Sequence, residues 1–292
     1  MNKERIIGGL VNLGIYLLAF GLAIIPYYFL YINNIHPLIS MFIYTLTATF
    51  VVYIFCLIFK NTSIYDPYWS VAPLVMAIIH MVAYRLYNVN AIIFTALVFI
   101  WAFRLTRNWY ITYKGLNPQY EDWRYSKYRN SLSRFKFEVV NFVGLIYVPT
   151  LVVYASFIPG LVFMFETTFN PLAIIGFTIM LTGPVLELIA DYQAHKFIKE
   201  SQDRSQVCNY GLWNYSRHPN YLGELTFWLG VAVTLLVTRI DLWYFSLGYI
   251  LMALLFLFIS IPLMEKHNLE KRPSYQEYKK HTSMLLILPR RK

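Results

Sequence analysis

Charged side chains are the first thing that this sequence lacks. Asp, Glu, Lys and Arg together make up 14% of its 292 residues, whereas an average soluble domain has roughly 25%. Hydrophobic residues make up 58% and aromatic residues 18%. A soluble protein needs more charged residues than this to cover its surface. The composition therefore excludes a soluble protein and is typical of a membrane protein.

Cysteine and the common cofactor motifs are also scarce or missing. Cys56 and Cys208 offer neither a disulfide framework nor a metal-ligand spacing. The histidines are scattered without an HxxxH pair, and although Glu187, Asp191 and His195 share one helical face, we predict no metal site. No GxGxxG and no GxxxxGK[ST] is present, which excludes the Rossmann and P-loop modes of nucleotide binding.

Long apolar runs, in contrast, are abundant. A helix needs about 20 apolar residues to cross the hydrocarbon core of a bilayer. A soluble domain of this size cannot bury so many runs. We therefore predict an all-α fold, a polytopic transmembrane bundle of 7–8 spans that forms one integral membrane domain over residues 1–292. The runs cover approximately 6–31, 37–59, 68–87, 90–110, 139–165, 171–190, 221–238 and 242–264.

The net charge of +10 is a topology signal. If the N-terminus is cytoplasmic and there are eight spans, all of the 25 Lys and Arg residues except Arg85 and Arg239 fall on the inner side. An excess of basic residues marks cytoplasmic loops. We therefore predict that both termini are cytoplasmic, that anionic lipid headgroups are the partners of these charges, and that nucleic acid is not a partner.

The first apolar run reads as a retained membrane anchor, because no small-residue cleavage site follows it. The protein is then a multi-pass membrane protein, of the inner membrane in a bacterium or of the endoplasmic reticulum in a eukaryote. The sequence leaves its oligomeric state open.

Ionisable residues near the inner ends of two spans are candidate site residues, because such residues are costly in a membrane. Glu187 and Asp191 lie four residues apart and so share one helical face, and Asn220 and Glu224 repeat that spacing on the next span. The structural alternative for these acids is a simple ion pair at the membrane interface.

The decapeptide "YSRHPNYLGE" (215–224) lies between these two pairs. A helix that begins at Pro219, with Arg217 and His218 before it, offers free N–H groups and positive charge that suit a phosphate. The alternatives are that Pro219 only starts the helix and that Arg217 reaches lipid headgroups. We favour a nucleotide-like cofactor whose phosphates lie in the cytoplasm.

Several motifs resemble the steroid 5-alpha-reductase-like membrane proteins, and most closely their poorly characterised bacterial-type branch. These are "ELIADYQ", "GLWNYSRHPNYLGE" with Trp228 after it, and the tail "RPSYQEYKKHTSMLLILP". The segments "YDPYWSVAP", "WAFRLTRNW" and "EDWRYSKYR" are also similar to that branch. The resemblance covers about residues 60–289, whereas residues 1–59 carry no recognised motif.

The resemblance implies an NADPH-dependent reduction of a carbon–carbon double bond conjugated to a ketone. By position it implies that Asp66 is the catalytic acid with Tyr65 beside it, although the steroid enzymes have a longer acid and an amide neighbour there. The residues that it implies for cofactor binding, together with the candidates above, are Arg104, Asn108, Glu187, Asp191, Tyr215, Arg217, Asn220, Glu224 and Tyr275.

The residue types suit this chemistry, because a protonated acid or a tyrosine near the carbonyl oxygen stabilises the charge that hydride addition creates. Desolvation at a membrane edge favours a protonated Asp66. We expect a lipophilic substrate that enters from the bilayer. Its identity, steroid or another lipid, stays open.

A second enzyme class shares part of this pattern. Membrane methyltransferases that act on prenylated cysteine or phospholipid also use an "RHPxYxG" loop and a glutamate-bearing tail, here Glu265, to hold S-adenosylmethionine. The "ADYQ" and "DPYW" elements favour the reductase. A transporter is disfavoured, because the polar residues cluster at the inner ends of the spans and not in repeats near the midplane.

Overall fold

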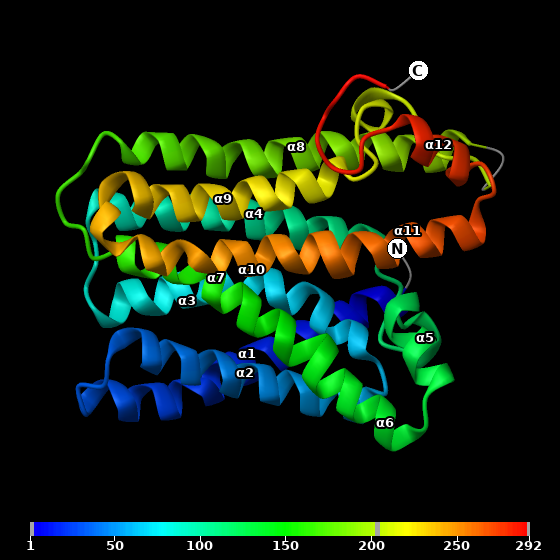
Figure 1. Ribbon diagram of the computed structural model, residues 1–292. Helices are drawn as coiled ribbons and strands as arrows, with labels where there is room; N and C mark the ends of the chain where they lie inside the picture. Colours follow the sequence, from blue (N-terminus) through cyan, green and yellow to red (C-terminus); the bar gives the residue numbers. More distant parts are fainter. Residues whose placement is uncertain (1–2, 202–204, 291–292) are drawn as a thin grey trace. The chain divides into compact units, whose positions relative to one another are not determined.

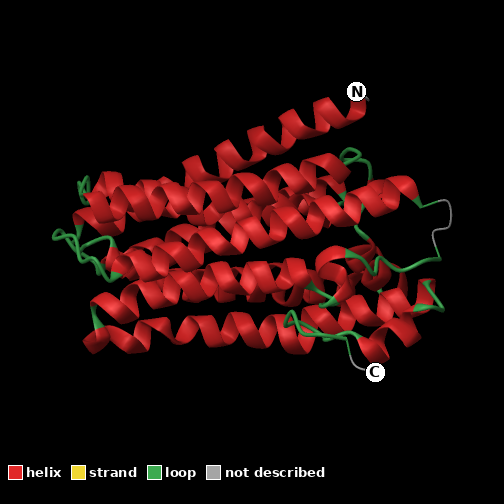
Figure 2. Cartoon of the chain, turned by 90° about the horizontal axis from the view of Figure 1, so that it is seen from above, coloured by secondary structure: helices red, strands yellow, loops and turns green. Residues whose placement is uncertain are grey.

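A computed structural model describes residues 3–201 and 205–290. Throughout these residues the regular elements are helices, and Figure 2 shows no strand among them. Eight helical segments are long and apolar enough to cross a membrane, which confirms the all-α fold and the predicted number of spans. The segments are Lys3–Ile32, Pro37–Phe59, Thr62–Ala83, Val89–Thr112, Arg134–Phe163, Ala173–Glu200, Pro219–Thr238 and Ile240–Lys271.

The chain divides into two compact units, Met1–Thr168 and Phe169–Lys292. The prediction of one domain and the orientation of the termini both stay predictions, and three of the basic residues used for the topology, Arg204, Arg291 and Lys292, lie outside the described residues.

The first unit contains five spans. α1 and α2 lie side by side in it, and α3 packs on α4 (Figure 1). Its elements are α1 (Lys3–Ile32), α2 (Pro37–Phe59), η1 (Thr62–Ile64), α3 (Tyr65–Ala83), α4 (Val89–Thr112), η2 (Pro118–Tyr120), α5 (Trp123–Ser131), α6 (Arg134–Val139), η3 (Val140–Tyr147) and α7 (Val148–Phe163).

The second unit contains three spans. α8 and α9 form its most extensive helix pair (Figure 1), and the short α12 follows α11 at its C-terminal end. Its elements are α8 (Ala173–Glu200), η4 (Gly211–Asn214), α9 (Pro219–Thr238), η5 (Ile240–Leu247), α10 (Gly248–Leu255), η6 (Phe256–Ser260), α11 (Ile261–Lys271) and α12 (Tyr275–His281).

Two proline residues explain why two of the spans contain a π-helical stretch. η3 and η6 are π-helical stretches, and Pro149 and Pro262 stand two residues after their respective last residues. Proline has no N–H and its ring displaces the preceding carbonyl. A local π-helix lets the span continue past that missing bond, so each of these spans stays one continuous helix.

Glycine allows the close approach of α8 and α9. A Cβ atom at Gly223 would lie 2.4 Å from Cγ of Glu187 and 2.7 Å from the carbonyl oxygen of Gly183. Those separations are far below ordinary van der Waals contact. The two helices therefore meet at this depth only because both Gly183 and Gly223 lack a side chain, and the Glu187 side chain packs against Gly223 there.

We expect Gly223→Ala to lower the melting temperature of the purified protein, because the added methyl group overpacks the α8–α9 contact at a cost of about 1–3 kcal/mol. Gly21→Ala is the matched control, since a Cβ atom at Gly21 has nothing within 4 Å. The higher helix propensity of alanine acts equally in both variants. Equal melting temperatures for the two variants contradict the close approach.

Candidate functional site

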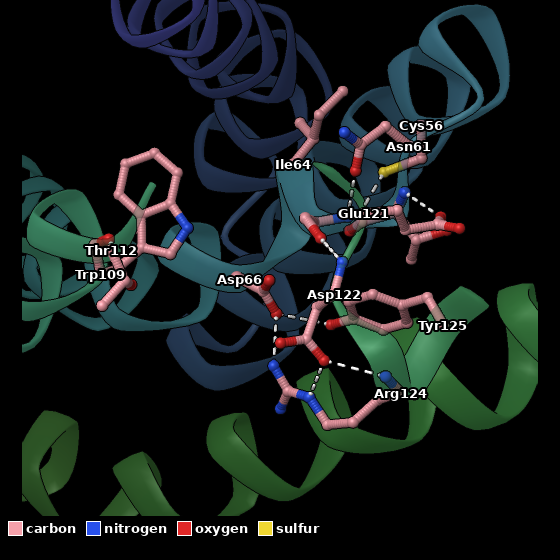
Figure 3. Close-up of polar contacts among 12 residues, drawn as sticks. Cys56, Asn61, Ile64, Asp66, Trp109, Thr112, Glu121, Asp122, Arg124 and Tyr125 are labelled. Atoms are coloured by element: carbon pink, nitrogen blue, oxygen red, sulfur yellow. Dashed lines mark hydrogen bonds and ion pairs between the residues drawn. The ribbon is translucent and has the colours of Figure 1, made fainter. Parts of the chain in front are cut away.

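The carboxylate of Asp66 is the centre of a polar cluster in the first unit. Asn61 begins the turn η1, where its side chain accepts a hydrogen bond from the Ser63 N–H at 2.9 Å, and Asp66 follows on the first turn of α3. Its Oδ1 accepts hydrogen bonds from the Tyr125 hydroxyl at 2.7 Å and from Nη2 of Arg124 at 3.0 Å. Figure 3 shows both donors converging on Asp66 from α5.

Two acids hold α5 in this position. Oε1 of Glu121 accepts from the Thr62 N–H at 2.8 Å, and both of its oxygens accept from Arg129 at 2.7 and 2.8 Å. The Asp122 N–H donates to Oγ of Ser63 at 2.7 Å (Figure 3). The segment before α5 is thus bonded to the turn before α3, and this docking presents Arg124 and Tyr125 to Asp66.

Tyr125 is a proton donor in this cluster, because its hydroxyl donates to Oδ1 of Asp66. The same oxygen accepts from the guanidinium of Arg124, so both bonds use protons of the donors. Burial, reinforced by the neighbouring Asp66, raises the pKa of the Tyr125 phenol well above its usual value, so the phenol keeps its proton at neutral pH. The Arg124 side chain is 41% exposed and connects the cluster to solvent.

Tyr65 points elsewhere. Its hydroxyl lies 2.8 Å from Oγ1 of Thr150 on α7, and the Thr150 hydroxyl itself donates to the Ile146 carbonyl at 2.9 Å. Tyr65 is therefore the donor in that pair, and its side chain is buried between helices. The predicted neighbour of Asp66 in sequence is not its partner in space.

Arg124 and Tyr125 are the residues that the sequence interpretation missed. They lie in "EDWRYSKYR", a segment that was noted only for its resemblance, and Tyr125 is 59 residues from Asp66. No spacing rule connects residues so far apart. The available signal was a segment rich in charged and aromatic residues between two predicted spans, a composition that also suits a solvated surface.

Arg104 and Asn108 lie on α4 in the same unit and share a helical face. Arg104 is buried, whereas Asn108 is half-buried. One contact of α4 with α3 is a hydrogen bond of 3.0 Å between Ser70 and Thr106. The predicted polar face of α4 thus exists, and its role in cofactor binding stays a prediction.

In the second unit, the predicted acids lie on α8 and α9, the helices that pack on each other. Glu187 and Glu224 are both buried, and Gly223 packs directly on the Glu187 side chain. Nε1 of Trp228 donates to Oε1 of Glu224 at 2.8 Å. Asp191 and Asn220 are half-buried. Asp191 lies one turn closer than Glu187, and Asn220 one turn closer than Glu224, to the polar loop between α8 and α9.

The guanidinium of Arg217 is hydrogen-bonded to other residues of the chain. Its Nε donates to Oε1 of Glu265 at 2.7 Å, and its Nη1 donates to the carbonyls of Lys279 and Thr282, each at 2.8 Å. Lys279 also contacts Oε2 of Glu265 at 2.6 Å. His218 lies 3.6 Å from the same carboxylate, and burial lowers its pKa below the usual value, so the imidazole is neutral at neutral pH.

The C-terminal segment is clamped onto residues 215–217. The Arg217 N–H donates to the Ser283 carbonyl at 2.9 Å, and the Leu288 N–H donates to the Tyr215 carbonyl at 3.3 Å. Oγ of Ser216 donates to the Leu285 carbonyl at 2.6 Å. Residues 215–217 of the decapeptide that the sequence assigned to a cofactor therefore bind the C-terminal segment of the chain.

The Tyr215 side chain is left exposed by this clamp and lines an open cavity of about 540 Å³. Gln193 and Tyr210 lie on the same cavity. Tyr275, at the start of α12, is buried and packs on Tyr278 with 5.7 Å between ring centroids. Of the predicted cofactor residues in this unit, Tyr215 is the one that a bound molecule reaches most easily.

Metal-binding residues do not assemble in the part of the chain that the structure describes, where no group of three or more His, Cys, Asp or Glu side chains is placed to hold an ion.

Comparison with protein-family models assigns the chain. Residues 52–282 match the model of DUF1295, described as a protein of unknown function. The chain belongs to the DUF1295 family. An uncharacterised protein of Schizosaccharomyces pombe, C594.04c, is 26% identical over 245 residues, which cover 75% of this chain and 70% of that protein. No solved structure matches the chain.

We expect Glu265→Gln to destabilise the second unit by about 3 kcal/mol, because Arg217 is then left buried without its carboxylate. The measurements are the melting temperature and the rate at which a protease cleaves the C-terminal segment. Glu277→Gln is the control, since Glu277 pairs with Lys280 at 2.8 Å on the surface, where both side chains are more than 60% exposed, and such pairs contribute little. A larger effect from Glu277→Gln contradicts the clamp.

Proposed function

We propose that this protein is a membrane-embedded, NADPH-dependent reductase of a carbon–carbon double bond conjugated to a carbonyl in a lipophilic substrate. The observation that carries the proposal is the convergence of Tyr125 and Arg124 on Asp66 at the end of a membrane-spanning helix. A charged cluster in that place is costly. Reduction of an enone uses such a cluster, because negative charge develops on the carbonyl oxygen.

The family assignment supports the same reaction. The DUF1295 family is associated with steroid 5-alpha-reductase-like proteins, and the matched residues 52–282 contain all the site residues named from the resemblance. The shorter acid and the different neighbour at Asp66 favour a lipid substrate that need not be a steroid.

The second unit suits the sugar and carboxamide parts of a dinucleotide. Asp191 and Asn220 are half-buried, one turn from the buried Glu187 and Glu224 on their helices. A carboxylate accepts hydrogen bonds and an amide both accepts and donates them, so these side chains suit hydroxyl and amide groups. Arg217 does not suit the phosphates as it lies, because its guanidinium is bonded to Glu265 and to main-chain carbonyls. When bound, the dihydronicotinamide supplies a hydride; the protein's residues orient the substrate and move the proton.

The alternative is a membrane methyltransferase that uses S-adenosylmethionine. The observation that favours it is the buried Glu265 held by Arg217 of the "RHPxYxG" loop. Methyl transfer to a thiolate or an amine needs no proton donor at a carbonyl oxygen, however, and so gives no use to the cluster around Asp66. The reductase is therefore the better supported function.

We expect Asp66→Asn to lower turnover of a lipophilic enone by roughly 10²–10⁴-fold, the range expected when acid catalysis is lost, and to leave NADPH binding nearly unchanged. Turnover is measured as NADPH oxidation by protein in lipid nanodiscs, and binding by fluorescence titration. Asp241→Asn is the control, because Asp241 is paired only with the exposed Arg239 in the described contacts. An Asp66→Asn variant with wild-type turnover contradicts the role of this acid.

Binding of NADPH, NADH and S-adenosylmethionine to the purified protein separates the two functions. We expect NADPH to bind most tightly, and we expect Asn220→Ala to weaken it by about tenfold, the effect of losing one hydrogen bond of about 1.4 kcal/mol. Tight binding of S-adenosylmethionine alone favours the methyltransferase and rejects the reductase.

A further inference from the structure

We propose that the cavity beside Tyr215 in the second unit binds the neutral, hydroxyl-rich head group of a membrane lipid, such as the sugar of a glycolipid. The cavity lies between α8 and the segment 205–218, which carries η4 and folds back along α8 (Figure 1). Its volume of about 540 Å³ is within the roughly 300–1,000 Å³ that is usual for small-molecule sites. This binding site is separate from the proposed reduction and does not depend on it.

Hydrogen bonds to Gln193 hold one wall of the cavity. Oε1 of Gln193 accepts from the Leu212 N–H at 2.8 Å, and the Gln193 carbonyl accepts from the Tyr210 hydroxyl at 2.6 Å. Gly211 has a φ of +60°, and a Cβ atom there would lie 2.4 Å from Cδ of Gln193. Only glycine lets the loop pass so close to α8 in that conformation. The wall is therefore fixed before any ligand binds.

Amides and phenols supply the polar groups of the cavity. Among the residues that the structure describes, no charged side chain lines it. The side chains of Asn209, Asn214 and Tyr215 take part in none of the hydrogen bonds between described residues, so a ligand can bind them without breaking any of those bonds. Amides both donate and accept hydrogen bonds, as ligand hydroxyls do. Anionic head groups, in contrast, are bound by basic pockets.

Two tyrosine rings supply apolar faces. Tyr210 and Tyr215 are 37% and 43% exposed, and both line the cavity. Tyrosine combines an apolar ring face with a polar hydroxyl, which matches a sugar ring with C–H groups on its faces and hydroxyls on its edge. Tyrosine at the end of a span also serves as an interfacial anchor, but an anchor needs no amide groups around it. The combination of rings and amides therefore favours a hydroxyl-rich ligand.

An apolar row on α8 leads into the cavity and indicates that the ligand is a lipid. Leu181, Val185 and Ile189 follow one another at four-residue intervals and are 43%, 47% and 41% exposed. Residues four apart form a continuous row on a helix surface, and Gln193 is the next member of this row. Ile189 and Gln193 both line the cavity. A hydrocarbon chain can thus lie along the row while its head group occupies the cavity, where the row changes from apolar to polar.

The cavity lies on the side of α8 away from its two acids. Ile189 is two residues from both Glu187 and Asp191, and two residues along an α-helix are a turn of about 200°. The acids that the sequence assigned to a cofactor therefore face away from this cavity. Of the residues predicted to bind the cofactor, Tyr215 is the one that lines it, and its role here is to bind the lipid head group.

Titration of monoglucosyl dioleoylglycerol into the purified full chain tests the site, in a detergent without a sugar head group and with bound lipid counted by native mass spectrometry. We expect Asn214→Ala to weaken binding about tenfold, the effect of one lost hydrogen bond, and Tyr215→Ala to weaken it at least as much. Gln206→Ala and Tyr192→Ala are the matched controls and keep wild-type affinity, because both side chains are exposed and neither lines the cavity. Equal affinities in all five proteins, or no binding to wild type, overturn the site.

Three competitors define the ligand. Phosphatidic acid is an anionic lipid and should displace the glycolipid poorly; displacement as effective as by unlabelled glycolipid overturns the neutral class. Methyl glucoside has the sugar without the chain, and equal potency from it overturns the lipid assignment. Displacement by NADPH assigns the cavity to the cofactor and overturns the proposal. If the glycolipid binds as expected and wild-type protein reduces no enone with NADPH, only the proposed function fails.

Discussion

A carboxylate at the end of a membrane-spanning helix needs partners from its own chain, because lipid offers no hydrogen bonds. Two such carboxylates organise this protein. Asp66 holds Tyr125 and Arg124 of α5, and Glu265 holds Arg217 and Lys279. In each unit the acid lies on a span, and its partners lie on segments outside the spans. The acids therefore decide how the polar segments fold back onto the ends of the bundle.

The two clusters differ in how exposed their hydrogen-bond donors are. Around Glu265 the donors are consumed: Arg217 also bonds two carbonyls, and the tail residues pair with the loop. That cluster is a clamp, and it fixes the loop from which Tyr215 projects. Around Asp66, one phenol and one half-exposed guanidinium face the same oxygen. The exposed edge of Arg124 leaves this cluster open to solvent, which the buried Arg217 does not do for the other.

Different contacts hold the helices within each unit. Gly183 and Gly223 let α8 and α9 approach closely, and Glu187 and Glu224 are buried on these two helices. In the other unit, Glu121 and Asp122 fasten α5 to the turn before α3. In the helix pair, backbone lies against backbone, whereas α5 is held by hydrogen bonds and ion pairs, by the buried Tyr125 ring and by Arg129 over the Phe137 ring.

The sequence by itself determined the helical class, a count of seven or eight spans, and the shared helical face of Glu187 with Asp191 and of Asn220 with Glu224, because hydropathy and a four-residue spacing are local properties. It also marked Asp66, as an acid at the start of a span. Only the tertiary structure decided which side chains meet that acid. Tyr65 is adjacent in sequence, but helical geometry turns it toward Thr150, while Tyr125 arrives from a distant segment. Likewise, the charge of Arg217 was evident from the sequence, but its partner Glu265 lies 48 residues away, and only chain folding determines which acid a buried guanidinium meets.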